Sequence, residues 1–385
     1  MADQGLTDAP LAERLGLDGE YLESDLPLLI RREGMAELVD GSVRILDRRV
    51  LPHTIEYLEC DTVEDVAVAI ESMAIQGAFT LSLAAGYAMA MEAGAMEAGS
   101  RRNGTTVGRC LADARRRLLA TRPTGAALRR MLDAVYAVAV GSPDGASGPA
   151  AAGYVSGVAA TLAKQALATG RHALDVLDGV DSILTHCFAD RAFLYFLLEA
   201  KRRDREIHVY ASETRPYLQG ARLTAPSVQQ IGHPVTLITD GMGGFLMTQG
   251  LVGAVVTAAD RVCLDGTICN KIGTYQYAVA AAANELPYVV LRQSGPDAGS
   301  ASAADVDVEY RDGEEVLHFD GRRQTVEGVT GLYPAFDITP PDLIYRIVTD
   351  RGAFLPANVS GYFDAPALPG LELSTSGRSA DSLTP

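Results

Sequence analysis

The sequence predicts an α/β protein: a Rossmann-like, doubly wound parallel sheet in the C-terminal domain, preceded by a smaller, mostly helical domain with a short strand pair. From Val180 onward, short runs of apolar and β-branched residues alternate with segments whose apolar residues recur at helical spacing. This alternation indicates a parallel sheet with helices on both faces. Before Val180 helical spacing dominates. A chain of 385 residues exceeds the size at which one hydrophobic core stops growing, so two domains are expected.

The first half begins with an acidic, weakly periodic segment, residues 1–38, which we interpret as a surface extension with one or two short helices. Residues 42–60 alternate in a way that indicates a strand pair. Thr62 then suits the N-cap of a helix, because Glu64 and Asp65 follow in the first turn. Three more helical patterns extend to residue 140. A segment rich in Gly, Pro, Ser and Ala, 141–153, predicts a flexible connection near a domain boundary.

The second half contains five strand-like runs, in DSILTHC, EIHVYAS, HPVTLITD, GAVVTAAD and LPYVVLRQ. A late helix is expected after Thr339 as cap and Pro340 at the first position. The predicted divisions are an extension (1–38), a mainly helical domain (39–170), a Rossmann-like domain expected to be catalytic (171–365) and a disordered tail (366–385).

The composition excludes several classes of function. The formal net charge of −16 would repel a polyanion, so nucleic acid is not an expected partner. The sequence has no signal-like start and no apolar run of membrane-spanning length, so no membrane partner is expected. Five scattered cysteines without a CxxC pattern or zinc spacing predict a reducing, cytoplasmic location and no metal site.

Polar residues stand where the strand-like runs end, and in open α/β sheets ligands bind at the carboxyl ends of the strands. These residues are Cys187, Ser212, Glu213, Asp240 and Asp260. An unpaired cysteine is ordinarily a small buried hydrophobe, but a thiol between a strand and a helix start faces N–H groups that favour the thiolate. His186 points to the opposite face of the strand, so we interpret it as structural.

The segment Asp240-Gly-Met-Gly-Gly244, followed twenty residues later by Asp260, looks like a dinucleotide fingerprint. Leu246 occupies the place of the third glycine, and the motif lies in the third βα unit rather than the first. A tight turn without a cofactor is therefore the better interpretation of these glycines.

Three further sites carry candidate ligand-binding residues. Asn270 and Lys271 precede a helix and suit a phosphate site, although a solvated loop lysine is an equal alternative; Lys271 is one of only three lysines. Gln219 stands at the mouth of the second βα connection, and Arg122 precedes a helix of the other domain. An ordinary surface charge is the alternative for an arginine, and only convergence at one cleft favours function.

These residues lie in long strings that resemble the methylthioribose-1-phosphate isomerase family, which is related to ribose-1,5-bisphosphate isomerase and to regulatory subunits of an initiation-factor exchange complex. The strings are LTHC, HVYASETRPYLQGARLTA, PVTLITDGMGGFLM, AADRV, NKIGTYQYAV and YPAFDITPPDLI, within residues 43–356. The resemblance implies catalysis by Cys187 and Asp260, no metal or other cofactor, and a homodimer. It places substrate-binding positions at Gln76, Gly77, Ala78, Arg122, Gln219, Asn270 and Lys271.

The implied reaction converts an aldose 1-phosphate into the ketose 1-phosphate. A proton donor must open the sugar ring, which a carboxyl with a raised pKa could do; Asp260 suits this role. Hydrogen must then move between C2 and C1, either through a Cys187 thiolate acting as base or as a hydride that the pair only stabilises. Arg122 and Lys271 would hold the phosphate of this small-molecule substrate.

Two departures from the family pattern bear on the substrate. Gln76-Gly-Ala-Phe-Thr-Leu-Ser82 stands where the family has Arg-Gly-Ala-Pro-Ala-Ile-Gly, which removes a cation, and Phe188-Ala-Asp190 replaces Asn-Ala-Gly. We therefore expect isomerisation of a 5-substituted or 5-deoxy ribose 1-phosphate, such as 5-methylthioribose 1-phosphate, to the ribulose 1-phosphate, in methionine salvage or specialised metabolism. The alternative is a non-catalytic regulatory subunit that senses a sugar phosphate or nucleotide.

Overall fold

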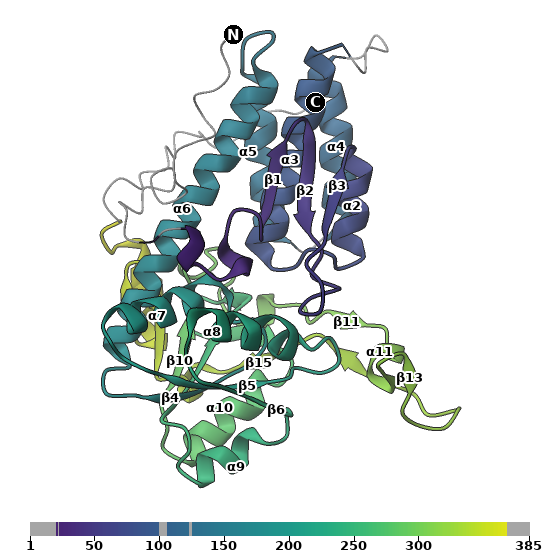
Figure 1. Ribbon diagram of the computed structural model, residues 1–385. Coiled ribbons are helices and arrows are strands. Elements are labelled where there is room, and N and C mark those ends of the chain that lie inside the picture. Colours follow the sequence, from purple (N-terminus) through teal and green to yellow (C-terminus); the bar gives the residue numbers. More distant parts are fainter. Residues whose placement is uncertain (1–20, 22, 100–105, 123–124, 368–385) are drawn as a thin grey trace.

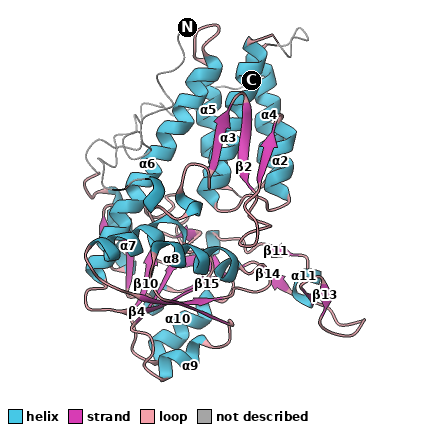
Figure 2. Ribbon diagram, viewed as in Figure 1, coloured by secondary structure: helices cyan, strands magenta, loops and turns pink. Residues whose placement is uncertain are grey.

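The computed structural model describes residues 21, 23–99, 106–122 and 125–367. Its N-terminal part combines a small antiparallel sheet with a group of helices, and its C-terminal part is a layered α/β unit (Figure 1, Figure 2). The predicted fold class is confirmed. None of the helices in the described ranges is long and apolar enough to cross a membrane.

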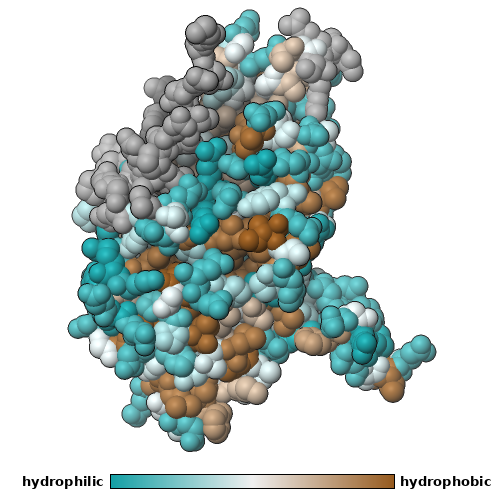
Figure 3. All heavy atoms as spheres, in the orientation of Figure 1, coloured by the Kyte–Doolittle hydropathy of each residue, from teal (hydrophilic) through white to brown (hydrophobic). Residues whose placement is uncertain are grey.

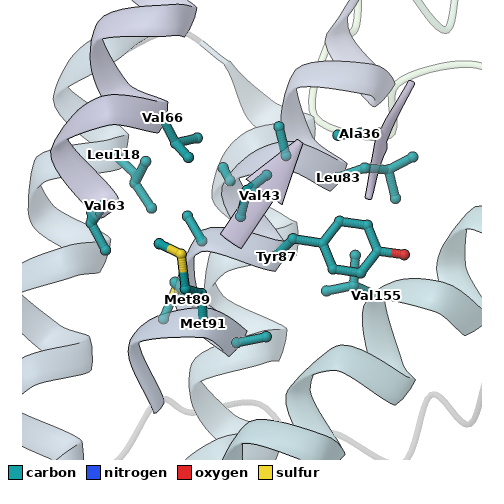
Figure 4. Packing of buried hydrophobic residues seen from close by; sticks show 14 of the residues in the cluster. Ala36, Val43, Val63, Val66, Leu83, Tyr87, Met89, Met91, Leu118 and Val155 are labelled. Carbon is teal, nitrogen blue, oxygen red and sulfur yellow. The ribbon is translucent and has the colours of Figure 1, made fainter. Parts of the chain in front are cut away.

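The N-terminal part is organised around one central helix. The elements are β1 (Ala36–Val39), β2 (Ser42–Leu46), β3 (Tyr57–Cys60), α2 (Val63–Glu71), α3 (Ala78–Glu97), α4 (Val107–Thr121) and α5 (Ala126–Val140). Helix α3 contacts β1, β2 and the helices α2, α4, α5 and α6 (Ser147–Val176). Its many Ala and Gly residues allow this close packing. Figure 4 shows Leu83, Tyr87 and Met89 of α3 among Val43, Leu118 and Val155 from three neighbouring elements.

Helix α2 begins as the sequence predicts. Thr62 has extended backbone angles, and its side chain accepts a hydrogen bond from the Asp65 N–H at 3.1 Å. The Asp65 carboxylate in turn accepts a hydrogen bond from the Thr62 N–H at 2.9 Å. This reciprocal arrangement satisfies donors that a helix start leaves open.

The prediction of a surface extension over residues 1–38 is wrong for its described part, and the strand pair is a three-stranded sheet. Strand β1 pairs with β2, and β2 pairs with β3. Leu26, Leu28, Leu29 and Ile30 are all less than 9% exposed, because this segment packs against both halves of the molecule. The acidic residues around them concealed this apolar group in the sequence. Residues 1–20 and 22 lie outside the described ranges.

The predicted flexible connection over 141–153 is also wrong, because helix α6 (Ser147–Val176) occupies its second half. The Glu97 carboxylate accepts hydrogen bonds from the N–H groups of Ser147 (2.6 Å) and Gly148 (3.2 Å) and so caps this helix. A Cβ on Gly148 would lie 2.8 Å from the Gly94 Cα, so small residues here allow α3 and α6 to touch. Helix α6 continues across the domain boundary predicted between residues 170 and 171. This boundary stays a prediction.

The C-terminal part is built on a seven-stranded sheet of order β17-β16-β10-β7-β4-β5-β6. Neighbouring strands are parallel except for β17 against β16. The strands are β4 (Ser182–Thr185), β5 (His208–Ser212), β6 (Val235–Ile238), β7 (Ala254–Ala258), β10 (Tyr288–Leu291), β16 (Arg346–Thr349) and β17 (Gly352–Phe354). The first five of these are the predicted strands.

Helices cover both faces of this sheet, as the doubly wound fold requires. Helices α6, α7 (Asp190–Arg202) and α8 (Ala225–Ile231) pack on one face, and α9 (Gly243–Thr248) and α10 (Thr274–Ala283) pack on the other. The chain leaves β4 toward β5 and β6, and then returns to β7 on the other side of β4. The strand order therefore reverses between β4 and β7, and this switch point is where such folds bind ligands.

The remaining segments extend this unit. A small sheet contains β8 (Arg261–Val262), β9 (Ile268–Lys271) and β15 (Phe336–Thr339). An arm projects from the molecule in Figure 1 and holds β11 (Tyr310–Arg311), α11 (Glu314–Leu317), β12 (His318–Phe319), β13 (Arg322–Arg323) and β14 (Tyr333–Pro334). The late helix predicted after Thr339 is wrong. A three-residue 3-10 turn, Pro341–Leu343, leads into β16, whose Ile347, Val348 and Thr349 favour a strand. Most of the predicted tail, 368–385, lies outside the described residues.

Candidate active site

A cavity of about 220 Å³ lies between the N-terminal helices and the carboxyl ends of the sheet strands. Its wall includes Gln76, Gly77 and Ala78 at the start of α3, Arg122 at the end of α4 and Asp260 beyond β7. Five of the nine sequence-predicted site residues therefore border one cavity. Both halves of the chain contribute, which sequence proximity alone could not indicate.

Cys187 lies two residues beyond the end of β4, and its backbone is held on both sides. Its N–H donates to the Thr214 Oγ1 at 2.9 Å, and its carbonyl accepts from the Thr224 Oγ1 at 2.6 Å. Cys187 has φ of 63°, and Asp190 and Thr214 each have φ of 64°. Non-glycine residues in this region are strained, and such strain gathers at functional sites. The arrangement fixes the thiol instead of leaving it on a mobile loop.

Burial raises the pKa of the Cys187 thiol to about 11, although the charge of Lys271 acts to lower it. The thiol is therefore neutral at neutral pH. The thiolate expected from the position between strand and helix is disfavoured in this structure, because desolvation exceeds the effect of the N–H groups and of Lys271.

Asp260 lies two residues beyond the end of β7, the strand beside β4. Thr185 of β4 pairs with Val256 of β7, so Cys187 and Asp260 extend from the same edge of two adjacent strands. Asp260 is exposed to the cavity and not packed in the core. Surrounding protein nevertheless shields it from bulk water, and this desolvation raises its pKa against the opposing charges of Lys271 and Arg292. A reachable carboxyl with a raised pKa suits a proton donor.

Lys271 links these two groups. Its side chain is buried on β9, and its ammonium lies 4.6 Å from the centroid of the Phe336 ring. Burial lowers the Lys271 pKa, and the Cys187 and Asp260 groups act in the opposite direction. Within the described chain, one lysine charge thus acts on both the thiol and the carboxyl, which brings the three residues into one electrostatic group. The solvated-loop alternative for Lys271 is wrong, because the side chain is 5% exposed.

The start of α10, expected to supply N–H groups for a phosphate, is already occupied. The Asp337 carboxylate accepts hydrogen bonds from the N–H groups of Gly273 (2.7 Å) and Tyr275 (3.1 Å). Burial raises the Asp337 pKa to about 6. The start of α3 is different, because Gly77 offers no side-chain cap and both Gly77 and Ala78 are exposed at the cavity. Its first N–H groups suit an anion.

Gln219 and Asn270 are buried next to the site and are absent from the cavity wall. The Asn270 amide donates to the Thr274 Oγ1 at 3.0 Å. The Gln219 Oε1 has no hydrogen-bond partner, which is uncommon for a buried polar atom. The neighbouring Gly220 has a steric reason, since a Cβ there would lie 1.7 Å from the Ser212 carbonyl oxygen.

The residues interpreted as structural are held by local contacts. His186 is 1% exposed; its Nδ1 lies 2.5 Å from the Ser212 Oγ and its Nε2 lies 2.8 Å from the Ile272 carbonyl oxygen. The Asp240 carboxylate accepts from the N–H groups of Thr214 (2.8 Å) and Arg215 (2.7 Å). A Cβ on Gly243 would lie 2.3 Å from the Tyr277 ring. These contacts account for the DGMGG turn without a dinucleotide.

Sequence reasoning missed several cavity residues, above all Arg292 after β10 and Glu309 and Arg311 at the base of the arm. Arg311 donates to the Glu309 carboxylate at 2.8 Å, and Arg122 lies 4.0 Å from the same carboxylate. Glu309 therefore connects the arm with the N-terminal helices. The position of Arg292 after a predicted strand was a usable signal, whereas nothing in the sequence indicated the arm. No group of three or more His, Cys, Asp or Glu suited to a metal occurs among the described residues.

Comparison with known proteins identifies relatives that belong to one family. Residues 74–356 match the model of the Initiation factor 2 subunit family. The methylthioribose-1-phosphate isomerase of Roseiflexus sp. is 37% identical over 331 residues, covering 82% of this chain and 93% of that protein.

Two solved structures share the fold. The 5-methylthioribose 1-phosphate isomerase of Pyrococcus horikoshii has a TM-score of 0.78 at 29% identity, covering 90% of this chain and 98% of that one. The translation initiation factor eIF-2B subunit delta from A. fulgidus has a TM-score of 0.73 at 30% identity, covering 84% and 96%. The chain therefore belongs to the Initiation factor 2 subunit family, within which its curated relatives include methylthioribose-1-phosphate isomerases.

Proposed function

We propose that the protein is an aldose–ketose isomerase that converts a 5-substituted or 5-deoxy ribose 1-phosphate, such as 5-methylthioribose 1-phosphate, to the corresponding ribulose 1-phosphate. The observation that carries this proposal is the position of Cys187 and Asp260 beyond adjacent strands at the switch point of the sheet, with Lys271 acting on both. The isomerases among its relatives support the substrate class.

The cavity suits the charges of such a substrate. Arg122 and the open start of α3 border it, and these groups would bind the phosphate. Asp260 in its protonated form would donate to the ring oxygen, which opens the sugar and leaves C1 and C2 free to exchange hydrogen. Phe79 and Leu81, which also border the cavity, offer apolar surface for a substituent at C5.

The raised pKa of Cys187 bears on how hydrogen moves between C2 and C1. A thiolate could act as base, but a thiol whose pKa is about 11 is neutral at neutral pH and is then a poor base. A hydride shift needs no base at this position: as the hydride moves from C2 to C1, the 2-hydroxyl becomes the C2 carbonyl and its proton returns to the Asp260 carboxylate. The neutral thiol would instead pack beside C1 and C2 and exclude water from them.

The second candidate is a non-catalytic regulatory subunit that binds a sugar phosphate or nucleotide. The likeness to the eIF-2B subunit delta supports it. Asp260 on the cavity wall and Cys187 beyond the adjacent strand together favour the enzyme, because binding alone needs neither a thiol nor a carboxyl with a raised pKa.

Incubation with a panel of ribose 1-phosphates, followed by carbon-13 NMR, tests the proposal. We expect a ketone signal at C2 with 5-methylthioribose 1-phosphate or another member of the panel bearing a 5-deoxy or 5-substituted carbon. Ribose 5-phosphate, which lacks the anomeric phosphate, is the matched negative control. Saturable binding without any ketone would contradict the isomerase and favour the regulatory subunit.

We also propose that the protein is a cytoplasmic homodimer that acts in methionine salvage or a related pathway. Leu237, Met242, Phe245, Tyr275 and Val279, each more than 40% exposed, lie on β6, α9 and α10 or in the turn before α9. Figure 3 shows apolar side chains over the lower part of the molecule, where these elements lie in Figure 1. An exposed apolar face of this kind suits a second copy of the chain, and light scattering would give twice the chain mass.

A further inference from the structure

Arg48 carries a buried charge that the proposed chemistry has not used. It follows β2 in the loop toward β3, and its side chain is 2% exposed. The guanidinium donates to the Gln76 carbonyl at 2.9 Å and, more weakly, to the Gly34 carbonyl at 3.4 Å. Its Nε is buried without a hydrogen-bond partner. Within the described residues no carboxylate forms an ion pair with it.

The burial of the Arg48 guanidinium is energetically unfavourable for the folded protein. A buried guanidinium without a carboxylate partner is disfavoured, because desolvation of the charge is not offset. The adjacent acid cannot compensate, since Asp47 pairs with Arg49 at 2.7 Å. Burial lowers the Arg48 pKa to about 10, and the charge of Asp190 offsets this only in part. Arg48 therefore places a positive charge here that no carboxylate of the described residues neutralises, as a site for an anionic ligand would require.

The surroundings of Arg48 place it directly behind the cavity. Gln76, whose carbonyl it holds, borders the cavity and immediately precedes Gly77 and Ala78 at the uncapped start of α3. On another side, the Arg48 guanidinium lies 5.8 Å from the centroid of the Phe188 ring. Phe188 directly follows Cys187. Arg48 thus lies between the segment that suits the phosphate and the segment that carries the thiol.

We propose that Arg48 is a positioning residue for phosphate: its charge, acting from behind the cavity wall, and its hold on the Gln76 carbonyl together compensate for the uncharged side chain at position 76. The ligand class is a phosphate monoester dianion. The inference rests on the proposed function only for the identity of the sugar. Arg48 is not among the residues that border the cavity, so its removal is expected to weaken phosphate binding and not the chemical step.

The test measures phosphate affinity directly, by calorimetry with inorganic phosphate, together with KM and kcat for the sugar 1-phosphate. Arg48→Gln is expected to weaken inorganic phosphate binding and raise KM by about tenfold, the size of one charge-assisted interaction, with kcat changed by less than about threefold. Arg49→Gln is the matched control. It removes the same charge from the adjacent position, where the side chain is 41% exposed and paired with Asp47, and both constants should stay at the original values.

Moving the arginine from position 48 to position 76 distinguishes this role from a purely structural one. In the double variant Arg48→Gln/Gln76→Arg the guanidinium moves to a side chain that borders the cavity itself, and phosphate affinity should return to within about threefold of the original. If Arg48→Gln does not fold, Arg48→Lys carries the test, because it keeps the charge and should keep the affinity within the same range.

Unchanged phosphate affinity in Arg48→Gln overturns the inference, as does a folded double variant that regains none of the lost affinity, or a tenfold loss in a folded Arg48→Lys. These outcomes differ from failure of the proposed function. A protein whose phosphate binding depends on Arg48 but which isomerises no sugar keeps this inference and contradicts the isomerase. A protein that isomerises the sugar but keeps its phosphate affinity and KM in Arg48→Gln supports the isomerase and contradicts this inference.

Discussion

Replacing Asp260 by asparagine is expected to lower kcat for the sugar 1-phosphate by about 10²–10⁴-fold, the usual contribution of a positioned acid or base. Asparagine keeps the size of the side chain but has no acidic proton for the ring oxygen. Steady-state kinetics measures the loss, and KM should change little because phosphate binding resides elsewhere. Asp307→Asn is the matched control, since Asp307 also borders the cavity without lying at the end of β7. Full turnover in Asp260→Asn would show that Asp260 takes no part in the chemical step.

The pH profile of the unmodified protein provides a second measurement on Asp260. Because desolvation raises its pKa, the protonated form persists above the usual range of aspartate, and kcat/KM should fall as the pH rises through this raised pKa. The stability effect has the matching sign. The folded protein disfavours the charged carboxylate, so Asp260 destabilises the fold once the pH exceeds its unfolded pKa. Asp260→Asn should therefore melt at or above the original temperature near neutral pH.

Replacing Cys187 by serine is expected to lower kcat by about 10²-fold, the usual effect of slightly misplaced reacting atoms, with the fold retained. The contacts that fix this residue run through its backbone, to Thr214 and Thr224, and serine preserves them. The hydroxyl is smaller, more polar and more strongly hydrated than the thiol, so it admits water where the sugar carbons must lie. Cys269→Ser is the control, because Cys269 also borders the cavity, and its turnover should remain near the original. Equal losses in both variants would assign the effect to general packing.

Reaction in deuterium oxide separates the two hydrogen routes on the same protein. A thiolate base would exchange the abstracted proton with solvent and place deuterium at C1, and kcat/KM would rise as the pH approaches about 11, the pKa of Cys187. A hydride shift leaves C1 free of deuterium and shows no such rise. The raised pKa of the Cys187 thiol favours the second outcome.

Much of the C-terminal fold was predictable because its strands are short, β-branched and separated by clear helical patterns. The rule that ligands bind at carboxyl ends then gave a set of strand-end residues that included Cys187 and Asp260, and the family resemblance singled out these two. Strand order is a tertiary property, so the sequence could not indicate that β4 and β7 are neighbours. It also could not indicate that Asp337, distant along the chain, already occupies the start of α10.

Three of the errors have a common physical cause: tertiary packing outweighed the structure that the local composition indicated. Residues 141–153 are rich in Gly and Ala, which is typical of a linker, yet the same small residues allow α6 to touch α3. The buried leucines at 26, 28 and 29 were concealed by acidic neighbours. Arg48 was missed because its burial depends on segments around Gly34, Gln76 and Phe188 that meet only in the folded chain.

The central claim, that one thiol and one carboxyl act on the same sugar, is tested most directly by a crystal structure of Asp260→Asn soaked with 5-methylthioribose 1-phosphate or with whichever sugar the NMR panel identifies. We predict the phosphate at the start of α3 beside Arg122, the ring oxygen about 3 Å from the residue 260 amide, and C1 and C2 in van der Waals contact with the Cys187 sulfur. A sugar phosphate bound in another part of the molecule, or one that contacts only one of the two residues, would contradict the account.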